Sequence, residues 1–262
     1  MAPQVAPPIA LTIAGSDSGG GAGIQADLKT FHAHGVHGLS VIAAITSQNT
    51  RGVTAVHPVP LIHIRRQIEA VFDDFPIAAV KTGMLGNAAT VRLVAKELRK
   101  RKPAWLVVDP VMISTSGSRL LDENAVDAVI NELIPLADML TPNLPEAEAL
   151  LGHPLRTAKQ LTDAGEALLA LGAGSVLLKG GHARGDAVVD RYFDDRGTME
   201  IRHARLPREG HGTGCTLASA VAAELAQGQM PRSAVRRATA YVHRALKNGY
   251  RPGAGAIYVL RH

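Results

Sequence analysis

Six short apolar runs, each followed by a loop and most then by an amphipathic stretch, constrain the fold of this 262-residue chain more than any other feature. The runs have the length and composition of buried strands in a parallel sheet. They cover residues 9–14, 39–45, 78–81, 105–108, 139–141 and 176–179. Seven stretches with helical periodicity alternate with them: 24–34, 61–72, 87–101, 124–133, 158–171, 216–227 and 232–248. This alternation predicts an α/β fold with a mainly parallel central sheet and helices on both faces.

Two regions interrupt the alternation and are expected to add small antiparallel strands at the sheet edges. One is 52–60, and the other is a hairpin made of 187–193 and 198–202. The predicted N-caps are Asn87, Asp122 and Thr157. No linker, change of composition or fixed repeat divides the chain, so residues 1–262 are expected to form one domain, with 1–8 as a flexible N-terminus.

Charge and aromatic content bear on the class of partner. The chain has 28 basic and 23 acidic residues, a formal net charge of +5, but its basic clusters lie where helix surfaces are predicted. One Trp, four Tyr and four Phe are too few and too scattered for a platform that stacks single-stranded nucleic acid. A nucleic-acid partner is therefore not expected.

The single cysteine, Cys215, excludes an internal disulfide and a cysteine-based zinc site. One free thiol fits a reducing compartment. The N-terminus lacks the basic segment of a targeting signal, and no apolar run is long enough to span a bilayer. We expect a cytoplasmic protein without a membrane partner.

Polar and glycine residues follow almost every predicted strand. In open α/β sheets, ligands bind at the carboxyl ends of the strands, so these residues are candidates for one site. They are 15–23, 46–49, 82–86, 109–112, 141–146 and 180–182.

The first glycine loop, 21–26, formally fits the dinucleotide-binding pattern G-x-G-x-x-A. That site also needs an acidic residue about 20 positions later to hold the ribose. No Asp or Glu lies between Asp27 and Glu69, and no Gly-Lys-Ser/Thr sequence follows to make a Walker A loop. The loop either lets the backbone approach a ligand, with Asp27 facing the same cavity, or is an ordinary turn before a helix.

The second glycine motif, 211–216, precedes an apolar helical run. It places backbone N–H groups at a helix N-terminus, which favours an anion hole for a phosphoryl group in flight, built from Gly212, Thr213 and Gly214. Cys215 at the same helix end is expected to have a lowered pKa and to accept a proton from an attacking hydroxyl. The alternative is a small cysteine buried in the core.

Asp109 and Glu146 each follow a predicted strand and offer two carboxylates for Mg²⁺, which takes one or two carboxylates together with phosphate oxygens. Lys179 ends an apolar strand and could contact a nucleotide phosphate. The alternatives are structural: stabilisation of a helix first turn for Glu146, a loop hydrogen bond for Asp109, and a lysine that reaches water for Lys179.

These motifs, taken together, resemble the bacterial hydroxymethylpyrimidine/phosphomethylpyrimidine kinases of thiamine biosynthesis, which belong to the ribokinase-like superfamily. The resemblance runs in order from about residue 9 to 227. It is carried by residues 11–18, 20–30, 48–50, 81–85, 109–112, 141–147, 179–182 and 211–216.

The resemblance implies a three-layer α/β/α ribokinase-like fold, a homodimer, and use of Mg²⁺ and ATP. The implied reaction phosphorylates 4-amino-5-hydroxymethyl-2-methylpyrimidine and then its monophosphate. The residues implied in the pyrimidine pocket are Gly15, Asp27, Gln48, Met84 and Val111. Those implied on the nucleotide and metal side are Asn143, Glu146, Lys179 and Asp109. Residues 212–215 would form the anion hole, with Cys215 where sugar kinases of the superfamily place an aspartate base.

Two other functions remain open, and a basic nucleic-acid binder, disfavoured by the charge distribution and aromatic content, is a third. A pyridoxine/pyridoxal kinase of the same subgroup would share the first loop and the cysteine anion hole. Gln48 favours the pyrimidine, because a side-chain amide matches the donor and acceptor edge of an aminopyrimidine. A non-catalytic pyrimidine- or nucleotide-binding regulatory protein could keep the fold, but would have no use for an intact anion hole beside Asp109 and Glu146.

Overall fold

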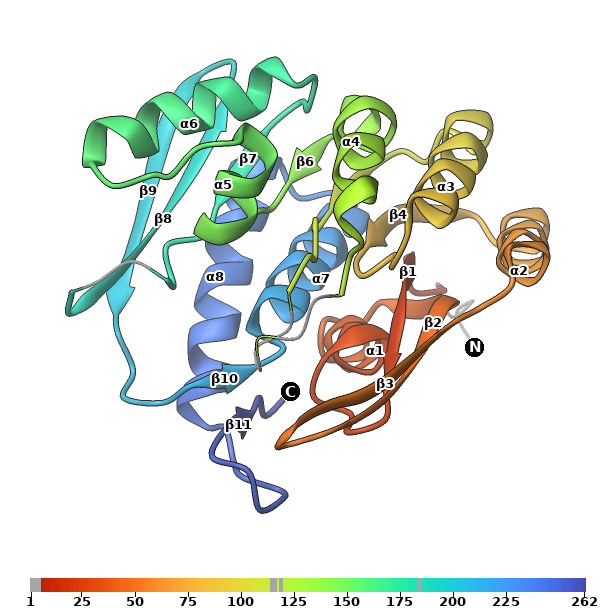
Figure 1. Cartoon of the computed structure of the whole chain (residues 1–262), viewed down its shortest axis with the longest axis horizontal. Coiled ribbons are helices and arrows are strands. Elements are labelled where there is room, and N and C mark those ends of the chain that lie inside the picture. The colour runs from red at the N-terminus through yellow and green to blue at the C-terminus, as the bar shows by residue number, and fades with distance from the viewer. Residues whose placement is uncertain (1–5, 114–116, 118–119, 183–184) are drawn as a thin grey trace, which may run out of the picture.

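One mixed sheet forms the centre of the molecule (Figure 1). The computed structural model describes residues 6–113, 117, 120–182 and 185–262. Within these residues the sheet has nine strands. In spatial order they are β3 (Gly52–Pro58), β2 (His37–Asn49), β1 (Ile9–Asp17), β4 (Ile77–Thr82), β5 (Leu106–Val108), β6 (Met139–Leu140), β7 (Val176–Leu178), β8 (Ala187–Asp194) and β9 (Gly197–Ala204).

The six strands from β2 to β7 in this order run parallel to one another. All six were predicted from the apolar runs, and each is confirmed. The antiparallel additions are confirmed as well, because β3 pairs with β2 at one edge and the β8–β9 hairpin extends the other. The parallel order places six strand ends along the same side of the sheet.

The helices lie on both faces of the sheet (Figure 1). They are α1 (Gly23–Ala33), α2 (Leu61–Asp74), α3 (Ala88–Arg101), α4 (Val126–Ala128), α5 (Leu144–Leu151), α6 (Ala158–Ala170), α7 (Thr213–Ala226) and α8 (Pro231–Lys247). Asn87 caps α3, accepting from Thr90 N at 2.9 Å, and Thr157 forms a capping box with Gln160 at the start of α6. Asp122 occupies a cap position, but its side chain makes no capping hydrogen bond there.

Two apolar cores, one on each face, follow from the two-residue period of the strands. Leu11 and Ile13 of β1 pack with residues of α2 to α6 in the first core. Ala10, from the same strand, packs with α1, α7 and α8 in the second. The alternation confirms three layers, α/β/α.

The predicted helix over 124–133 differs most from the observed structure. It is broken into a 3-10 turn (Glu123–Ala125), the short α4, a π turn (Val129–Leu133) and another 3-10 turn (Ile134–Leu136). Pro135 explains the break, because proline lacks the N–H that a regular helix needs and its ring obstructs the preceding turn.

Three further elements were not predicted. The helix α5 follows the Asn143 cap, and the two-residue strands β10 (Gly210–His211) and β11 (Tyr258–Val259) pair in parallel. Strands of two residues carry no periodicity that a sequence could reveal. β10 matters for the site, because it leads directly into α7.

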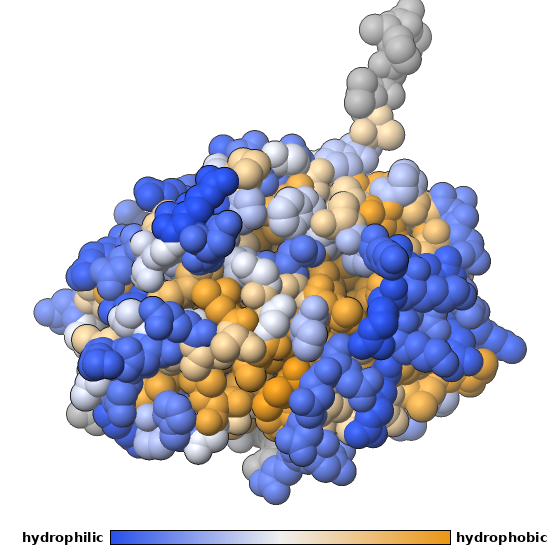
Figure 2. Space-filling model, turned by 90° about the horizontal axis from the view of Figure 1, so that it is seen from above, coloured by the Kyte–Doolittle hydropathy of each residue, from blue (hydrophilic) through white to orange (hydrophobic). Residues whose placement is uncertain are grey.

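The predicted flexible segment 1–8 lies partly outside the described residues, which begin at residue 6. Within the described part, the carbonyl of Pro8 accepts a hydrogen bond from His37 N at 2.9 Å, so the chain is fixed by residue 8. No helix in the described ranges is long and apolar enough to cross a membrane. Figure 2 shows hydrophilic side chains concentrated toward the margins of one face, with hydrophobic ones between them.

Candidate active site

A cavity of about 700 Å³ opens at the carboxyl ends of the parallel strands. It collects residues from loops that lie up to 200 positions apart in the sequence. Twelve of the thirteen residues singled out from the sequence line it: Gly15, Gln48, Met84, Asp109, Val111, Asn143, Glu146, Lys179, Gly212, Thr213, Gly214 and Cys215. The exception is Asp27.

Asp27 is fully buried behind the cavity wall, contrary to the expectation that it faces the cavity. Its carboxylate is held by Nζ of Lys81, 3.0 Å from Oδ1 and 2.9 Å from Oδ2. Thr12 Oγ1 and Ser219 Oγ also donate to it, each at 2.7 Å. Four interactions therefore occupy the carboxylate, and Lys81 is the member of the pair that reaches the cavity.

Lys81 is a cavity residue that the sequence reasoning did not assign a role. Burial lowers the pKa of its ammonium, but the charge and hydrogen bond of Asp27 together with the charges of Cys215 and Asp109 outweigh burial and keep the pKa above its usual range. The available signal was a lysine at the end of an otherwise apolar strand, where parallel strands present their side chains to a ligand.

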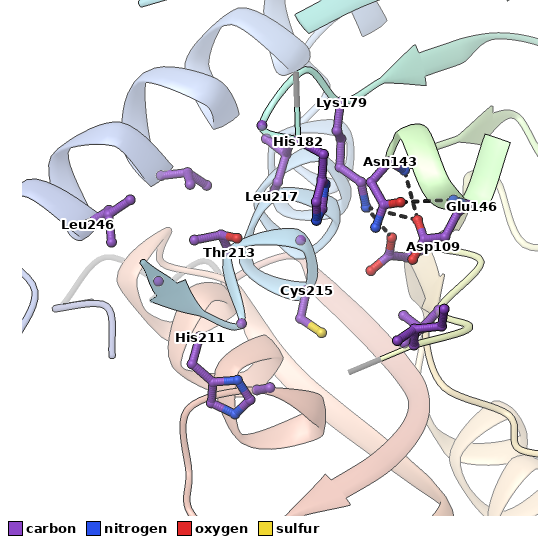
Figure 3. Close-up of a pocket in the computed structure, with 18 of the residues that line it drawn as sticks. Asp109, Asn143, Glu146, Lys179, His182, His211, Thr213, Cys215, Leu217 and Leu246 are labelled. Atoms are coloured by element: carbon purple, nitrogen blue, oxygen red, sulfur yellow. Dashed lines mark hydrogen bonds and ion pairs between the residues drawn. The ribbon is translucent and has the colours of Figure 1, made fainter. Parts of the chain in front are cut away.

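The start of α7 forms the floor of the cavity (Figure 3). The helix begins at Thr213, three residues earlier than predicted, so Thr213, Gly214 and Cys215 make up its first turn. The first N–H groups of a helix have no partner within it and carry the positive end of its dipole. These N–H groups lie at the cavity, where an anion could approach them.

Gly212 must be glycine for this turn to form. Its φ of 78° is left-handed, and a Cβ there would lie 2.0 Å from the carbonyl oxygen of Gly21. A side chain would therefore separate the first glycine loop from the anion hole.

Cys215 does not have the lowered pKa expected from its position at a helix N-terminus. Burial raises the pKa of its thiol to about 11, against the lowering effect of the Lys81 charge, and the charges of Asp27 and Asp109 raise it further. At neutral pH the thiol is therefore protonated in the unliganded protein. A position at a helix N-terminus is therefore not sufficient to lower the pKa of this thiol.

Three charged side chains lie together beside the first turn of α7 (Figure 3): Lys179, Asp109 and Glu146. Lys179 Nζ lies 2.7 Å from Oδ1 of Asp109 and 3.7 Å from Oε2 of Glu146. A Cβ on Gly214 would lie 3.2 Å from Lys179 Nζ, so the cluster adjoins the first turn of α7. All three side chains are buried, which corrects the alternative of a lysine that reaches water.

Glu146 combines a structural role with a place in the cavity. In the capping box of α5, its Oε2 accepts from Asn143 N at 2.8 Å, while Glu146 N donates to Asn143 Oδ1 at 2.9 Å. Burial, joined by the charge of Asp109, raises the pKa of Glu146 to about 7, although Lys179 acts in the opposite direction. One ammonium thus compensates two carboxylates incompletely.

This donor set fits Mg²⁺, which accepts carboxylate oxygens and completes its coordination with phosphates and water. Asp109 and Glu146 would be its protein ligands. No group of three or more His, Cys, Asp or Glu capable of holding a metal occurs in the described residues.

The opposite wall contains Gly15, Gln48, Met84 and Val111. A Cβ on Gly15 would lie 3.0 Å from Met84 Sδ, so glycine allows the methionine to approach the first strand closely. Gln48 is half-buried and lies within β2, next to its last residue, and not in a loop after the strand as the sequence predicted. The wall is mainly apolar with one amide, as expected for a flat heteroaromatic ligand.

The first glycine loop is organised by its own Asp17. Oδ1 accepts from Gly19 N at 2.7 Å, and Oδ2 accepts from Gly21 N at 3.0 Å and Ala22 N at 2.8 Å. These amide groups are therefore occupied and do not form a phosphate cradle, in agreement with the absence of a dinucleotide-binding acid in the sequence.

Residues 17–259 match the family model described as phosphomethylpyrimidine kinase. The chain is 50% identical over 240 residues to a hydroxymethylpyrimidine/phosphomethylpyrimidine kinase of Rhizobium meliloti, covering 91% of this chain and 90% of that protein. It is 46% identical over 246 residues to a thiamine biosynthesis bifunctional protein of Geobacter sulfurreducens, covering 94% of this chain but only 50% of that longer protein.

Two solved structures illustrate the likeness of the fold. A phosphomethylpyrimidine kinase of Clostridium difficile superposes with a TM-score of 0.82 at 45% identity, covering 91% of this chain and 99% of that one. An ADP complex of Bacillus subtilis pyridoxal kinase gives a TM-score of 0.90 at 34% identity, covering 97% of each chain. The three-layer architecture is thus ribokinase-like, as the sequence resemblance implied.

Proposed function

Because this chain belongs to the phosphomethylpyrimidine kinase family, we propose that it transfers a phosphoryl group from ATP to 4-amino-5-hydroxymethyl-2-methylpyrimidine, and then a second one to the monophosphate, in thiamine biosynthesis. The observation that carries the proposal is the position of the α7 N-terminus in one cavity. It lies between an apolar wall with one amide and a cluster of a lysine with two carboxylates.

The apolar wall supports binding of the pyrimidine. Met84 and Val111 would contact the ring, and Gln48 would pair with its edge. The amide of Gln48 offers one donor and one acceptor to a ring that presents an amino group beside a ring nitrogen. Gly15 would leave room for the ring beside β1.

The charged cluster supports binding of the nucleotide phosphates. Lys179 would contact a phosphate. Asn143, on the same side of the cavity, would help to orient Glu146 through their two hydrogen bonds. Asp109 and Glu146 would hold Mg²⁺, which when bound offsets the negative charge of the phosphates.

The first turn of α7 would hold the phosphoryl group during transfer. The partial positive charge of its N–H groups would face the negative charge on the transferred phosphoryl group. Positioning and electrostatic stabilisation of this kind supply most of the catalysis in phosphoryl transfer. The acceptor oxygen would form a bond to the γ-phosphorus while the bond to the ADP oxygen breaks. Cys215, as its thiolate, would take the proton of the alcohol.

Replacement of Gln48 by methionine tests the pyrimidine pocket. The change keeps side-chain length but leaves the polar edge of the ring without a partner, which costs about 1 to 3 kcal/mol. We expect kcat/KM for the pyrimidine alcohol to fall by the factor that corresponds to this free energy. The hydrolysis of ATP without acceptor should stay unchanged. An unaltered kcat/KM for the alcohol would remove Gln48 from the pocket.

A pyridoxal kinase activity is the second candidate, favoured by the TM-score of 0.90 to the Bacillus subtilis enzyme. The sequence identity points the other way, because it is 50% to the pyrimidine kinase of Rhizobium meliloti and 34% to the pyridoxal kinase. Steady-state assays with both alcohols separate the two functions. The proposal requires a higher kcat/KM for the pyrimidine.

We further propose that the protein works as a homodimer of single-domain subunits, each spanning residues 1–262, in the cytoplasm. Support for an interface comes from large apolar side chains exposed near the β2–β3 edge of the sheet: Ile45, Val56, Leu61 and Ile62. Ile45 and Val56 lie on opposite faces of the β2–β3 pair. A free cysteine and the absence of disulfides in the described chain suit a reducing compartment.

A further inference from the structure

Gln48, the amide proposed to read the pyrimidine edge, lies between two polar side chains. Its Nε2 is 2.9 Å from Nε2 of His211, and its Oε1 is 3.2 Å from Oγ1 of Thr46. The oxygen and nitrogen of an amide have nearly the same size, so only their partners decide which end faces which neighbour. Both neighbours impose a requirement.

His211 must carry a hydrogen on Nε2. The same atom lies 3.0 Å from Oδ2 of Asp17, and a carboxylate can only accept. Asp17 is ionised here: burial alone would raise its pKa, but hydrogen bonds from His211 and from the amides of Ala22 and Gly19 hold the pKa below its usual value. A protonated Nε2 has no lone pair, so it cannot accept a hydrogen bond from the Gln48 amide nitrogen.

Thr46 imposes the second requirement. Its hydroxyl lies 2.9 Å from the carbonyl oxygen of Ser16, which can only accept. This distance is shorter than the 3.2 Å to Gln48 Oε1, so the single hydroxyl hydrogen points mainly at Ser16. The lone pairs of Oγ1 remain, and they need a donor from Gln48 rather than another acceptor.

One orientation of the amide satisfies both neighbours. We infer that His211 and Thr46 together orient Gln48, with Oε1 toward His211 and Nε2 toward Thr46. His211 Nε2–H then donates to the carboxylate of Asp17 and to Oε1, and Nε2–H of Gln48 donates to Thr46. This inference makes His211 a positioning residue for substrate recognition, and it rests on the proposed function.

The orientation fixes the order of donor and acceptor that the cavity presents. One lone pair of Oε1 remains on the His211 side, and one N–H remains on the Thr46 side. They match a 4-aminopyrimidine whose amino group lies toward His211 and whose ring nitrogen lies toward Thr46. The 5-hydroxymethyl group is attached beside the amino-bearing carbon, so it also lies toward His211, which directly precedes Gly212 and the first turn of α7.

The 4-oxo counterpart of the substrate tests this order, because its ring N–H and carbonyl present donor and acceptor in reverse. The variant His211→Phe removes the N–H donor but keeps a ring beside Gly21. The two residues are close, because a Cβ added to Gly21 would lie 2.6 Å from the imidazole Cδ2. We expect the ratio of kcat/KM for the 4-amino alcohol to that for the 4-oxo alcohol to fall about 10- to 100-fold, mainly through KM.

Three further variants make the result specific. Thr46→Val removes the other orienting partner and should lower the same ratio, whereas His211→Gln restores an N–H donor and should recover part of it. His63→Phe, on the exposed surface of α2, is the matched control and should leave the ratio unchanged. If kcat/KM for the two alcohols falls by the same factor in His211→Phe and in Thr46→Val, the inference is overturned. These residues would then have only a structural role.

A measurement without turnover separates this inference from the proposed function. Nitrogen-15 NMR of the imidazole, assigned by the signal lost in His211→Phe, reports which ring nitrogen carries hydrogen. The inference requires a protonated Nε2 in the unliganded protein, and an unprotonated Nε2 would contradict it. If wild-type protein phosphorylates neither pyrimidine, the proposed function fails, while the NMR result still decides the orientation of Gln48.

Discussion

Cys215 shows how a residue's surroundings decide its chemistry. Its place in the glycine motif correctly indicated that it lies at the first turn of α7, beside the candidate anion hole. Its acidity could not be predicted, because the sequence contains neither the burial of the thiol nor the approach of Asp27 and Asp109. The raised pKa changes the expected behaviour of the enzyme with pH.

If the Cys215 thiolate accepts the proton of the alcohol, the first phosphorylation should accelerate with pH. Burial raises the pKa of the thiol to about 11, so well below this value the thiolate fraction grows about tenfold per pH unit. Single-turnover rates between pH 7 and 9 should rise for the pyrimidine alcohol but not for the monophosphate, whose acceptor oxygen is already ionised.

Cys215→Ala should accordingly slow the alcohol step about 10² to 10⁴-fold, flatten its pH profile, and affect the monophosphate step much less. Equal losses in both steps would make the cysteine a phosphate-positioning or structural residue instead.

Asp109 and Glu146 are expected to act on Mg²⁺ and its phosphates and not on the pyrimidine. Alanine at either position should therefore depress kcat while titration calorimetry with the free pyrimidine gives a nearly unchanged Kd. Because burial raises the pKa of Glu146 to about 7, the affinity for the Mg-nucleotide should also fall as pH decreases from 7 to 5 in the wild type. Weakened pyrimidine binding in the Asp109→Ala protein would move this carboxylate into the acceptor site.

Asp27 and Lys81 mark the limit of sequence reasoning about the site. Position along the strands brought twelve of the selected residues to one cavity. It could not show that Asp27 turns inward, because this depends on three partners, Thr12, Lys81 and Ser219, from three other elements. Lys81 was not assigned a role for the same reason, since its buried position at the cavity wall depends on its pairing with Asp27.

At the scale of elements, the start of α7 is the most demanding local structure in the protein. Gly212→Ala places a side chain at a φ of 78°, which alone costs about 1 to 2 kcal/mol, and 2.0 Å from a carbonyl oxygen. We expect lower stability in urea together with a large loss of kcat. Asn87→Ala, which removes the cap of α3 at a residue that does not line the cavity, is the control and should cost about 1 kcal/mol of stability without loss of kcat. Full kcat in the Gly212→Ala protein would exclude α7 from the reaction.

Helices and strands were predictable where a regular period extends over several turns or where one apolar run fills a strand. All six parallel strands and the helices α1, α2, α3, α6, α7 and α8 belong to this class. The segment around α4 was not predictable, because Pro135 disrupts the preceding helical turns although their residues have a helical pattern. β10 and β11 exist only through their mutual pairing, which joins segments about 48 residues apart and has no local signal.

For the whole molecule, the order of the sheet explains why one cavity can serve two substrates. The apolar wall comes from the ends of β1 and β2 and from the loops after β4 and β5, and the charged cluster comes from the loops after β5, β6 and β7. The start of α7 lies where these groups meet. Two apolar cores hold the layers on either side, so the loops rest on a rigid frame.

The edge beyond β2 is where the proposed homodimer is expected to associate. Ile45 and Val56 are 52% and 41% exposed on neighbouring strands. Ile45→Glu should shift the mass measured by sedimentation velocity from a dimer toward a monomer, because a buried, unpaired carboxylate opposes association. A dimer of unchanged stability would place the interface elsewhere, and a monomeric wild-type protein would reject the homodimer.

The most direct test of the central claim is mass spectrometry of the products formed with Mg²⁺ and ATP. The protein is incubated separately with the pyrimidine alcohol, its monophosphate and pyridoxal, and aliquots are followed over time. The proposed function predicts that the alcohol gives first a monophosphate and then a diphosphate, that the monophosphate gives the diphosphate directly, and that pyridoxal is phosphorylated more slowly. Faster phosphorylation of pyridoxal, or no phosphorylated pyrimidine at all, would contradict it.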